Sequence, residues 1–168
     1  MSFKTRETVA TETPASRATS LMVAAAEVEL FRRAAPHGGW IPRWAEALNA
    51  TEVPDSGEVV VAAFASDTAF VFGADTLRAF LVPGHTAGSV AYLFRGTLFA
   101  GDAISWSAVR GLRPAMAGYS DDIDQARRSL ASLRERLAPF RVEWLCSAHL
   151  KCAPATDGSW DRLLGDER

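Results

Sequence analysis

The chain has 168 residues, of which 48% are hydrophobic and 23% are charged, and its formal net charge is −2. A chain of this length and composition can bury one hydrophobic core, which predicts a single globular domain. The small negative charge and the lack of a basic cluster argue against nucleic acid as a partner. No apolar run approaches the ~20 residues that cross a bilayer, and the N-terminus does not resemble a signal peptide, so we expect a cytoplasmic protein that does not bind a membrane.

The first part of the chain is predicted to contain a tail and two helices. Residues 1–20 are polar and rich in Thr and Ser, so we expect a mobile tail in front of a domain over residues 21–168. Leu21–Arg33 predicts a helix, because it is rich in helix-forming residues and ends in two arginines. Residues 40–48 predict a second, short helix.

Short apolar runs separated by Gly and Pro then predict a series of strands. These runs cover residues 59–64, 68–72, 77–82, 90–94, 97–100 and 141–146. Tight turns are expected at residues 73–75 and 95–96, each of which contains a glycine.

The segment between the last two runs is predicted to form a loop and a helix. Residues 103–119 contain two glycines and two arginines and indicate a loop, where Arg110 and Arg113 either recognise an anionic group or are ordinary surface arginines. Residues 120–122 supply a capping residue and acidic side chains for a helix that Pro139 ends. The predicted buried face of this helix consists of Ile123, Ala126, Leu130, Leu133 and Leu137.

Three polar side chains follow three of the predicted strands. His85 comes after residues 77–82, Asp102 after residues 97–100, and His149 after residues 141–146. If these strands run parallel in one sheet, the three side chains converge at one edge. Two imidazoles and one carboxylate, with a fourth position left to water, are the pattern of a catalytic zinc site. Spacing alone favours the alternative in which His85 caps a turn, Asp102 caps a helix and His149 is a surface residue.

Two cysteines, Cys146 and Cys152, flank His149. In a cytosolic chain we expect both to be reduced thiols. A Cys-x2-His-x2-Cys arrangement could chelate a metal, but three ligands on one short loop would be strained, and a structural zinc takes four. We therefore expect Cys146 to be a buried residue at a strand end, and the role of Cys152 stays open.

Two motifs resemble those of a known family. The segments Pro83-Gly84-His85-Thr86-Ala87-Gly88-Ser89 and Leu98-Phe99-Ala100-Gly101-Asp102 resemble P-G-H-T-x-G-S and L-F-x-G-D of the metallo-β-lactamase superfamily. The resemblance covers roughly the C-terminal two-thirds of a family member. It implies an α/β (α+β) fold, namely an αββα sandwich that is incomplete because the N-terminal strands are lacking. In the family the motif His and Asp are metal ligands, and His149 matches a later histidine ligand.

The family's principal metal motif, H-x-H-x-D-H, does not occur in the chain. The resemblance therefore implies at most one ion of zinc, iron or manganese, held by His85, Asp102 and His149, or no ion at all. Asp102 is also the implied catalytic residue. His37 could replace a lost ligand, although a lone histidine in a Pro-His-Gly-Gly turn is more often merely solvated.

The implied function is that of a metal-dependent hydrolase. Such an enzyme cleaves an ester, a thioester or a related bond of a small-molecule substrate through a metal-activated water, and here the loss of the first motif would impair it. One alternative is a catalytically inactive, truncated homologue that acts as a binding or dimerisation module, and another is a gene fragment with a misplaced start. Because the missing strands would leave an apolar sheet face exposed, we expect a homodimer through that face or poor solubility.

Overall fold

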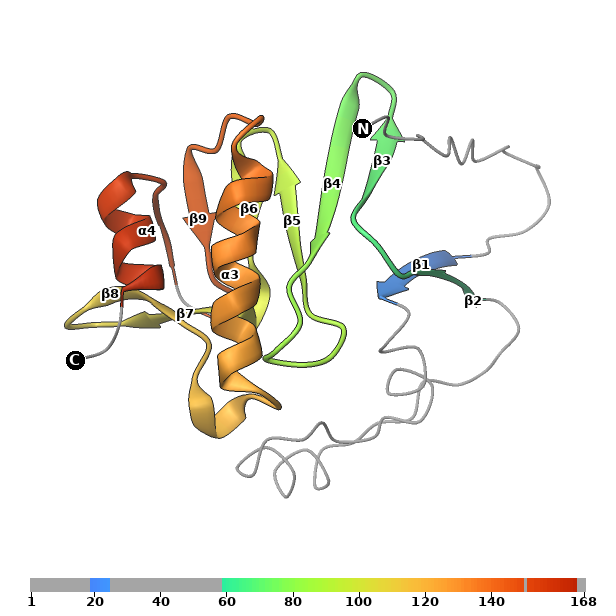
Figure 1. Ribbon diagram of the computed structural model, residues 1–168. Helices are drawn as coiled ribbons and strands as arrows, with labels where there is room; N and C mark the ends of the chain where they lie inside the picture. The colour runs from blue at the N-terminus through green and yellow to red at the C-terminus, as the bar shows by residue number, and fades with distance from the viewer. Residues whose placement is uncertain (1–18, 25–58, 150, 166–168) are drawn as a thin grey trace.

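The computed structural model describes residues 19–24, 59–149 and 151–165, with side chains described from residue 63 onward (Figure 1). The strands are β1 (Thr19–Ala24), β2 (Val59–Phe64), β3 (Thr68–Phe72), β4 (Asp75–Leu81), β5 (Val90–Phe94), β6 (Thr97–Phe99), β7 (Ile104–Ser107), β8 (Gly111–Pro114), β9 (Trp144–Cys146) and β10 (Cys152–Pro154). The α-helices are α3 (Ile123–Leu137) and α4 (Asp157–Leu164), and the short 3₁₀ helices are η2 (Gly101–Ala103) and η3 (Ala117–Tyr119).

Six strands form the central sheet, in the order β10-β9-β6-β5-β4-β3. Strand β5 is antiparallel to both β4 and β6, so β4 and β6 run in the same direction. Strand β9 pairs with β6 in parallel. The carboxyl ends of β4, β6 and β9 therefore lie at one edge of the sheet, which meets the condition under which the three polar side chains converge.

Most of the predicted strands and turns are confirmed. Strands β2, β3 and β5 begin and end at the predicted residues, and β4 begins slightly earlier, at Asp75. The turn between β5 and β6 has positive φ at both Arg95 (45°) and Gly96 (79°), which is the backbone of a two-residue type I′ hairpin. Strand β9 is shorter than predicted and begins only at Trp144, because residues 144–146 are the ones that pair with β6.

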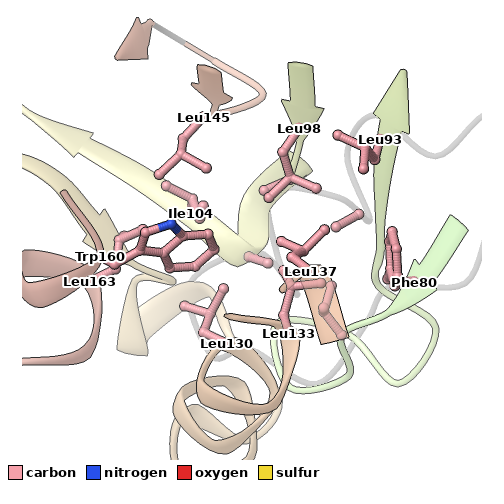
Figure 2. Packing of buried hydrophobic residues seen from close by; sticks show 14 of the residues in the cluster. Phe80, Leu93, Leu98, Ile104, Leu130, Leu133, Leu137, Leu145, Trp160 and Leu163 are labelled. Carbon is pink, nitrogen blue, oxygen red and sulfur yellow. The ribbon is translucent and has the colours of Figure 1, made fainter. Parts of the chain in front are cut away.

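The core lies between one face of the sheet and helices α3 and α4 (Figure 2). The predicted buried face of α3 is confirmed for Ala126, Leu130, Leu133 and Leu137, whereas Ile123 is only partly buried. Burying each of the leucines contributes roughly 1.5–3 kcal/mol. The sheet contributes Phe80, Leu93, Leu98 and Leu145, and α4 contributes Trp160 and Leu163.

Helix α3 also holds the loop that follows β4. The Ser129 hydroxyl donates a hydrogen bond to the Pro83 carbonyl at 2.7 Å. Two backbone amides just before the helix, those of Asp121 and Asp122, donate to the carbonyls of His85 and Gly84 at 3.0 and 2.9 Å. The backbone on either side of His85 is therefore fixed to the N-terminal end of α3.

Residues 103–119 were predicted to be a loop, and this prediction is wrong. They contain the antiparallel hairpin β7–β8, in which Trp106 pairs with Leu112. Ile104 and Leu112 are almost completely buried in the core. The alternation Ile-Ser-Trp-Ser is a strand pattern that the glycines and arginines nearby concealed. Strand β10 and helix α4, which complete the described C-terminal part, had not been predicted.

The predicted helix over Leu21–Arg33 is wrong at its start. Thr19–Ala24 form β1, which pairs in parallel with β2, so a strand already begins within the expected tail. Pairing with a distant strand overrides helix propensity, which is a weak preference. The other predictions for this part, namely the tail over residues 1–18, the remainder of the first helix, the helix over residues 40–48 and the role of His37, lie outside the described residues.

The second face of the central sheet carries exposed aromatic side chains. The two described α-helices pack on the first face (Figure 1). On the second face, Phe72, Phe99 and Trp144 are 56%, 48% and 45% exposed. No helix in the described ranges is long and apolar enough to pass through a membrane.

Gly84 is the residue at which a side chain would disturb this arrangement most. Its φ is +137°, and an added Cβ would overlap the backbone of Ala126 in α3. We predict that Gly84→Ala lowers the free energy of unfolding by roughly 3 kcal/mol, since it combines backbone strain with a steric clash. Urea unfolding followed by circular dichroism measures the change.

Gly73→Ala is the matched control for Gly84→Ala. Gly73 also has positive φ (+61°), but no atom beyond its two chain neighbours lies within 4 Å of an added Cβ. Gly73→Ala should lower the free energy of unfolding by only about 1 kcal/mol, the strain of a left-handed conformation. Equal destabilisation by the two substitutions would show that the contact between Gly84 and α3 does not matter.

Candidate metal and catalytic site

Backbone hydrogen bonds continue the parallel pairing of β6 and β9 beyond the strand ends. The Ala100 amide donates to the Cys146 carbonyl at 2.9 Å, and the Ala148 amide donates to the Gly101 carbonyl at 3.1 Å. These bonds keep the two chain segments side by side for several residues. As a result, Asp102 and His149 follow the ends of neighbouring strands at the same edge of the sheet.

The structure brings all three predicted site residues together. His149 Nε2 lies 3.1 Å from Asp102 Oδ1, and His85 Nε2 lies 3.9 Å from Asp102 Oδ2. The carboxylate thus stands between the two imidazoles and turns a different oxygen to each. His85 is mostly buried, with 14% of its side chain exposed, whereas 78% of the His149 side chain is exposed.

A buried serine, Ser120, supports His85 from behind. The Ser120 hydroxyl donates to the Met116 carbonyl at 2.8 Å, and its oxygen lies 3.5 Å from His85 Nδ1. Residues that contact the second nitrogen of a histidine orient the ring toward a metal. Sequence reasoning missed this role because it placed Ser120 among the capping residues of the helix. The cap is Asp122, which accepts a hydrogen bond from the Gln125 amide at 2.8 Å.

The donor set suits a divalent transition metal, but its arrangement is not that of a complete site. Two ligand atoms bound to one tetrahedral zinc lie roughly 3.3 Å apart, a value between the two nitrogen–oxygen distances found here. However, each imidazole faces a different carboxylate oxygen. Within the described ranges, no three His, Cys, Asp or Glu side chains are gathered closely enough to enclose one ion.

Cys146 and Cys152 are joined by a disulfide bond across the β9–β10 pair, in which they face each other. The prediction of reduced thiols is therefore wrong, and the Cys-x2-His-x2-Cys chelate is excluded because both sulfurs are already bonded. The missing information was β10, whose pairing brings the two Cα atoms to 4.0 Å. Cys146 is buried, as expected, and Cys152 is exposed.

The disulfide closes the short loop that carries His149. A backbone hydrogen bond from Ser147 to the Lys151 carbonyl, at 3.1 Å, closes the same loop one residue further in. Lys151 also places its ammonium group 5.5 Å from the centre of the Trp106 ring on β7. The exposed histidine is thus carried by a loop that is fixed at its base.

Comparison with known proteins identifies the fold. No protein-family model matches the sequence, and no characterised protein matches it by sequence. Solved structures do match: the chain has the fold of the metallo-β-lactamase superfamily, as the two motifs implied. The likeness is one of fold, since sequence identity stays below a fifth in the three structures described next.

The similar structures include a metallo-β-lactamase from Pontibacter korlensis, with 19% identity, a TM-score of 0.51 and 75% of this chain covered. The B3 metallo-β-lactamase BLEG-1 gives 18% identity, a TM-score of 0.53 and 83% coverage. A metallo-β-lactamase family protein from Thermus thermophilus gives 18% identity, a TM-score of 0.52 and 86% coverage of this chain. The matched part amounts to 54%, 61% and 51% of the length of these three proteins, so the chain spans little more than half of each.

The disulfide makes a prediction about stability. Replacing both cysteines in Cys146→Ala/Cys152→Ala should lower the free energy of unfolding by roughly 2 kcal/mol, because the unfolded chain loses a short covalent loop. Urea unfolding without reductant measures the difference. Wild-type protein unfolded in the presence of dithiothreitol should match the double variant. Two free thiols in the unfolded, unreduced protein would contradict the assignment.

Proposed function

We propose that the chain is a metallo-β-lactamase-fold hydrolase that cleaves an ester, a thioester or a related bond of a small molecule, with a single divalent ion. The observation that carries the proposal is the placement of the Asp102 carboxylate between the imidazoles of His85 and His149. Zinc, iron and manganese all accept such ligands. When bound, the ion supplies a Lewis acid that polarises the substrate and lowers the pKa of water.

The residues of the chain have separable roles in this proposal. Asp102 acts as a ligand and as the catalytic carboxylate, and its two oxygens keep the imidazoles turned toward the site. Ser120 holds His85 from its other nitrogen. The exposed His149 is the ligand on the side that is open to solvent and substrate. With only these three ligands, we expect slow turnover compared with a complete two-metal site.

Metal binding tests the proposal directly. After dialysis against zinc, iron(II) or manganese, elemental analysis should find no more than one ion per chain. His85→Ala, Asp102→Asn and His149→Ala should each weaken the affinity at least tenfold, which is about the smallest loss seen for residues that support a metal ligand. Competition with a chromophoric chelator measures the affinity, and hydrolysis of 4-nitrophenyl acetate should follow metal occupancy.

His37→Ala is the control for the loss of a histidine, and Asp124→Asn is the control for the loss of a carboxylate on the exposed side of α3. Both should bind metal as the wild type does. If His37→Ala weakens binding as strongly as His85→Ala, the ligand set is different from the one proposed. If the wild type retains none of the three metals, the hydrolase proposal fails.

A second candidate function is a catalytically inactive dimerisation module. The exposed aromatic residues on the second face of the sheet favour it, since monomeric proteins rarely expose large apolar patches. In that case two copies bury this face against each other. Dimerisation needs no metal, so adding a chelator should leave the sedimentation profile unchanged.

Dimerisation through this face is testable by substitution. Phe72→Ser/Trp144→Ser should weaken self-association about tenfold or more, as loss of buried aromatic contacts in an interface does. Sedimentation velocity over a range of protein concentrations measures the effect. Val109→Ser is the control, because Val109 is 93% exposed at the β7–β8 turn, away from the sheet face. A wild-type chain that stays monomeric at high concentration would contradict dimerisation.

A further inference from the structure

A pocket of about 400 Å³ lies next to the candidate site, between the β7–β8 hairpin, η3 and the first turns of α3. Its volume falls within the range of small-molecule pockets. The side chains that bear on its chemistry are Trp106, Arg113, Met116, Tyr119, Ile123 and Arg127. It is separate from the three proposed metal ligands, none of which lines it.

Short connections join the walls of this pocket to each of the three site residues. Ser105, on one wall, follows Asp102 closely in the chain. Met116, on another wall, accepts the hydrogen bond from Ser120, which in turn contacts His85. The Trp106 ring contacts Lys151 on the loop that carries His149. A molecule in the pocket would therefore contact residues that are linked to the proposed metal ligands.

The pocket combines positive charge with apolar surface. Arg113 reaches it from β8 and Arg127 reaches it from α3, and none of the Asp and Glu residues in the described part of the chain lines it. Arg127 forms an ion pair with Asp124 at 3.5 Å, but both side chains are largely exposed, so the pair is weak and an anion can compete for the guanidinium group. Two arginines from separate elements suit a carboxylate or a similar anion.

The remaining walls suit an apolar group. Met116 and Tyr119 are 56% and 40% exposed, so part of their apolar surface is accessible to a ligand. Trp106 packs against the core and presents a rigid aromatic wall, while methionine adapts to ligands of different shape. The pocket thus combines apolar walls with two positively charged side chains.

We propose that this pocket binds a small amphiphilic anion, an aryl or alkyl group that carries a carboxylate, with the acid on Arg127 and the positive charge of Arg113 on the facing wall. In the hydrolase this group is part of the substrate, so that its ester or thioester points toward Asp102. That last step rests on the proposed function, whereas the binding itself does not.

Binding to metal-free protein tests the proposal. Isothermal titration with 4-phenylbutyrate, after removal of metals with EDTA, should give saturable one-site binding. The neutral analogue 4-phenylbutan-1-ol should bind about tenfold more weakly or worse, because it cannot form the charge-assisted hydrogen bonds. Equal binding of acid and alcohol, or no binding of the acid, would overturn the proposal.

Arginine variants locate the site. Arg127→Gln should weaken the affinity for 4-phenylbutyrate about tenfold while leaving that for the alcohol unchanged. Arg128→Gln is the matched control: Arg128 is the next residue on α3, pairs with Asp122 at 4.0 Å and does not line the pocket. Arg113→Lys, which keeps the charge, tests the second arginine without removing a cation from the fold. Equal losses in Arg127→Gln and Arg128→Gln would overturn the assignment.

The test separates this proposal from the proposed function. Loss of ester hydrolysis with retained binding of 4-phenylbutyrate to metal-free protein would contradict the hydrolase and leave the pocket intact. Metal-dependent hydrolysis without selective binding of the acid would contradict the pocket and leave the hydrolase intact.

Discussion

The parallel pairing of β6 with β9 is the constraint on which the site depends. Leu98 and Leu145 occupy equivalent positions in the two strands and are both buried beneath α3 and α4, so this pairing cannot slip without exposing core residues. Because the backbone hydrogen bonds continue past the strand ends, the register of the core also sets the register of Asp102 against His149. The same register of β6 against β9 is therefore required for core packing and for the geometry of the site.

The two ends of the site are held in different ways. His85 is mostly buried, and its backbone is anchored to the start of α3, where Gly84 permits close approach. His149 is largely exposed on a loop closed by the disulfide between β9 and β10. One imidazole is fixed by packing and the other by a covalent bond. The neighbouring pocket opens between these supports and shares Ser120 and Lys151 as links to them.

The central strands and α3 could be predicted because their apolar periodicity and their turns agree with the fold. The convergence of His85, Asp102 and His149 was implied by the resemblance of their motifs to a known family, since their spacing alone favoured three unrelated roles. The β7–β8 hairpin could not be predicted, because the glycines and arginines around it indicated a loop and its alternating apolar pattern is short. Neither could the disulfide, since it depends on β10, a three-residue strand with little signal of its own. Strand β1 was mistaken for a helix because only pairing with β2 distinguishes it.

The pairing of β6 with β9 also bears on how the protein acquires its site during folding. Thr97 meets Trp144 only after the whole of α3 has been traversed, so the contact is distant in sequence, and closing such a long connection costs entropy before any contact compensates for it. The antiparallel pairs β3–β4, β4–β5 and β5–β6 need no such closure, and the β4–β5 pair flanks the loop of His85. The folding transition can thus form the loop of His85 early, whereas His149 reaches Asp102 only when the C-terminal segment docks, which makes that docking the slow step.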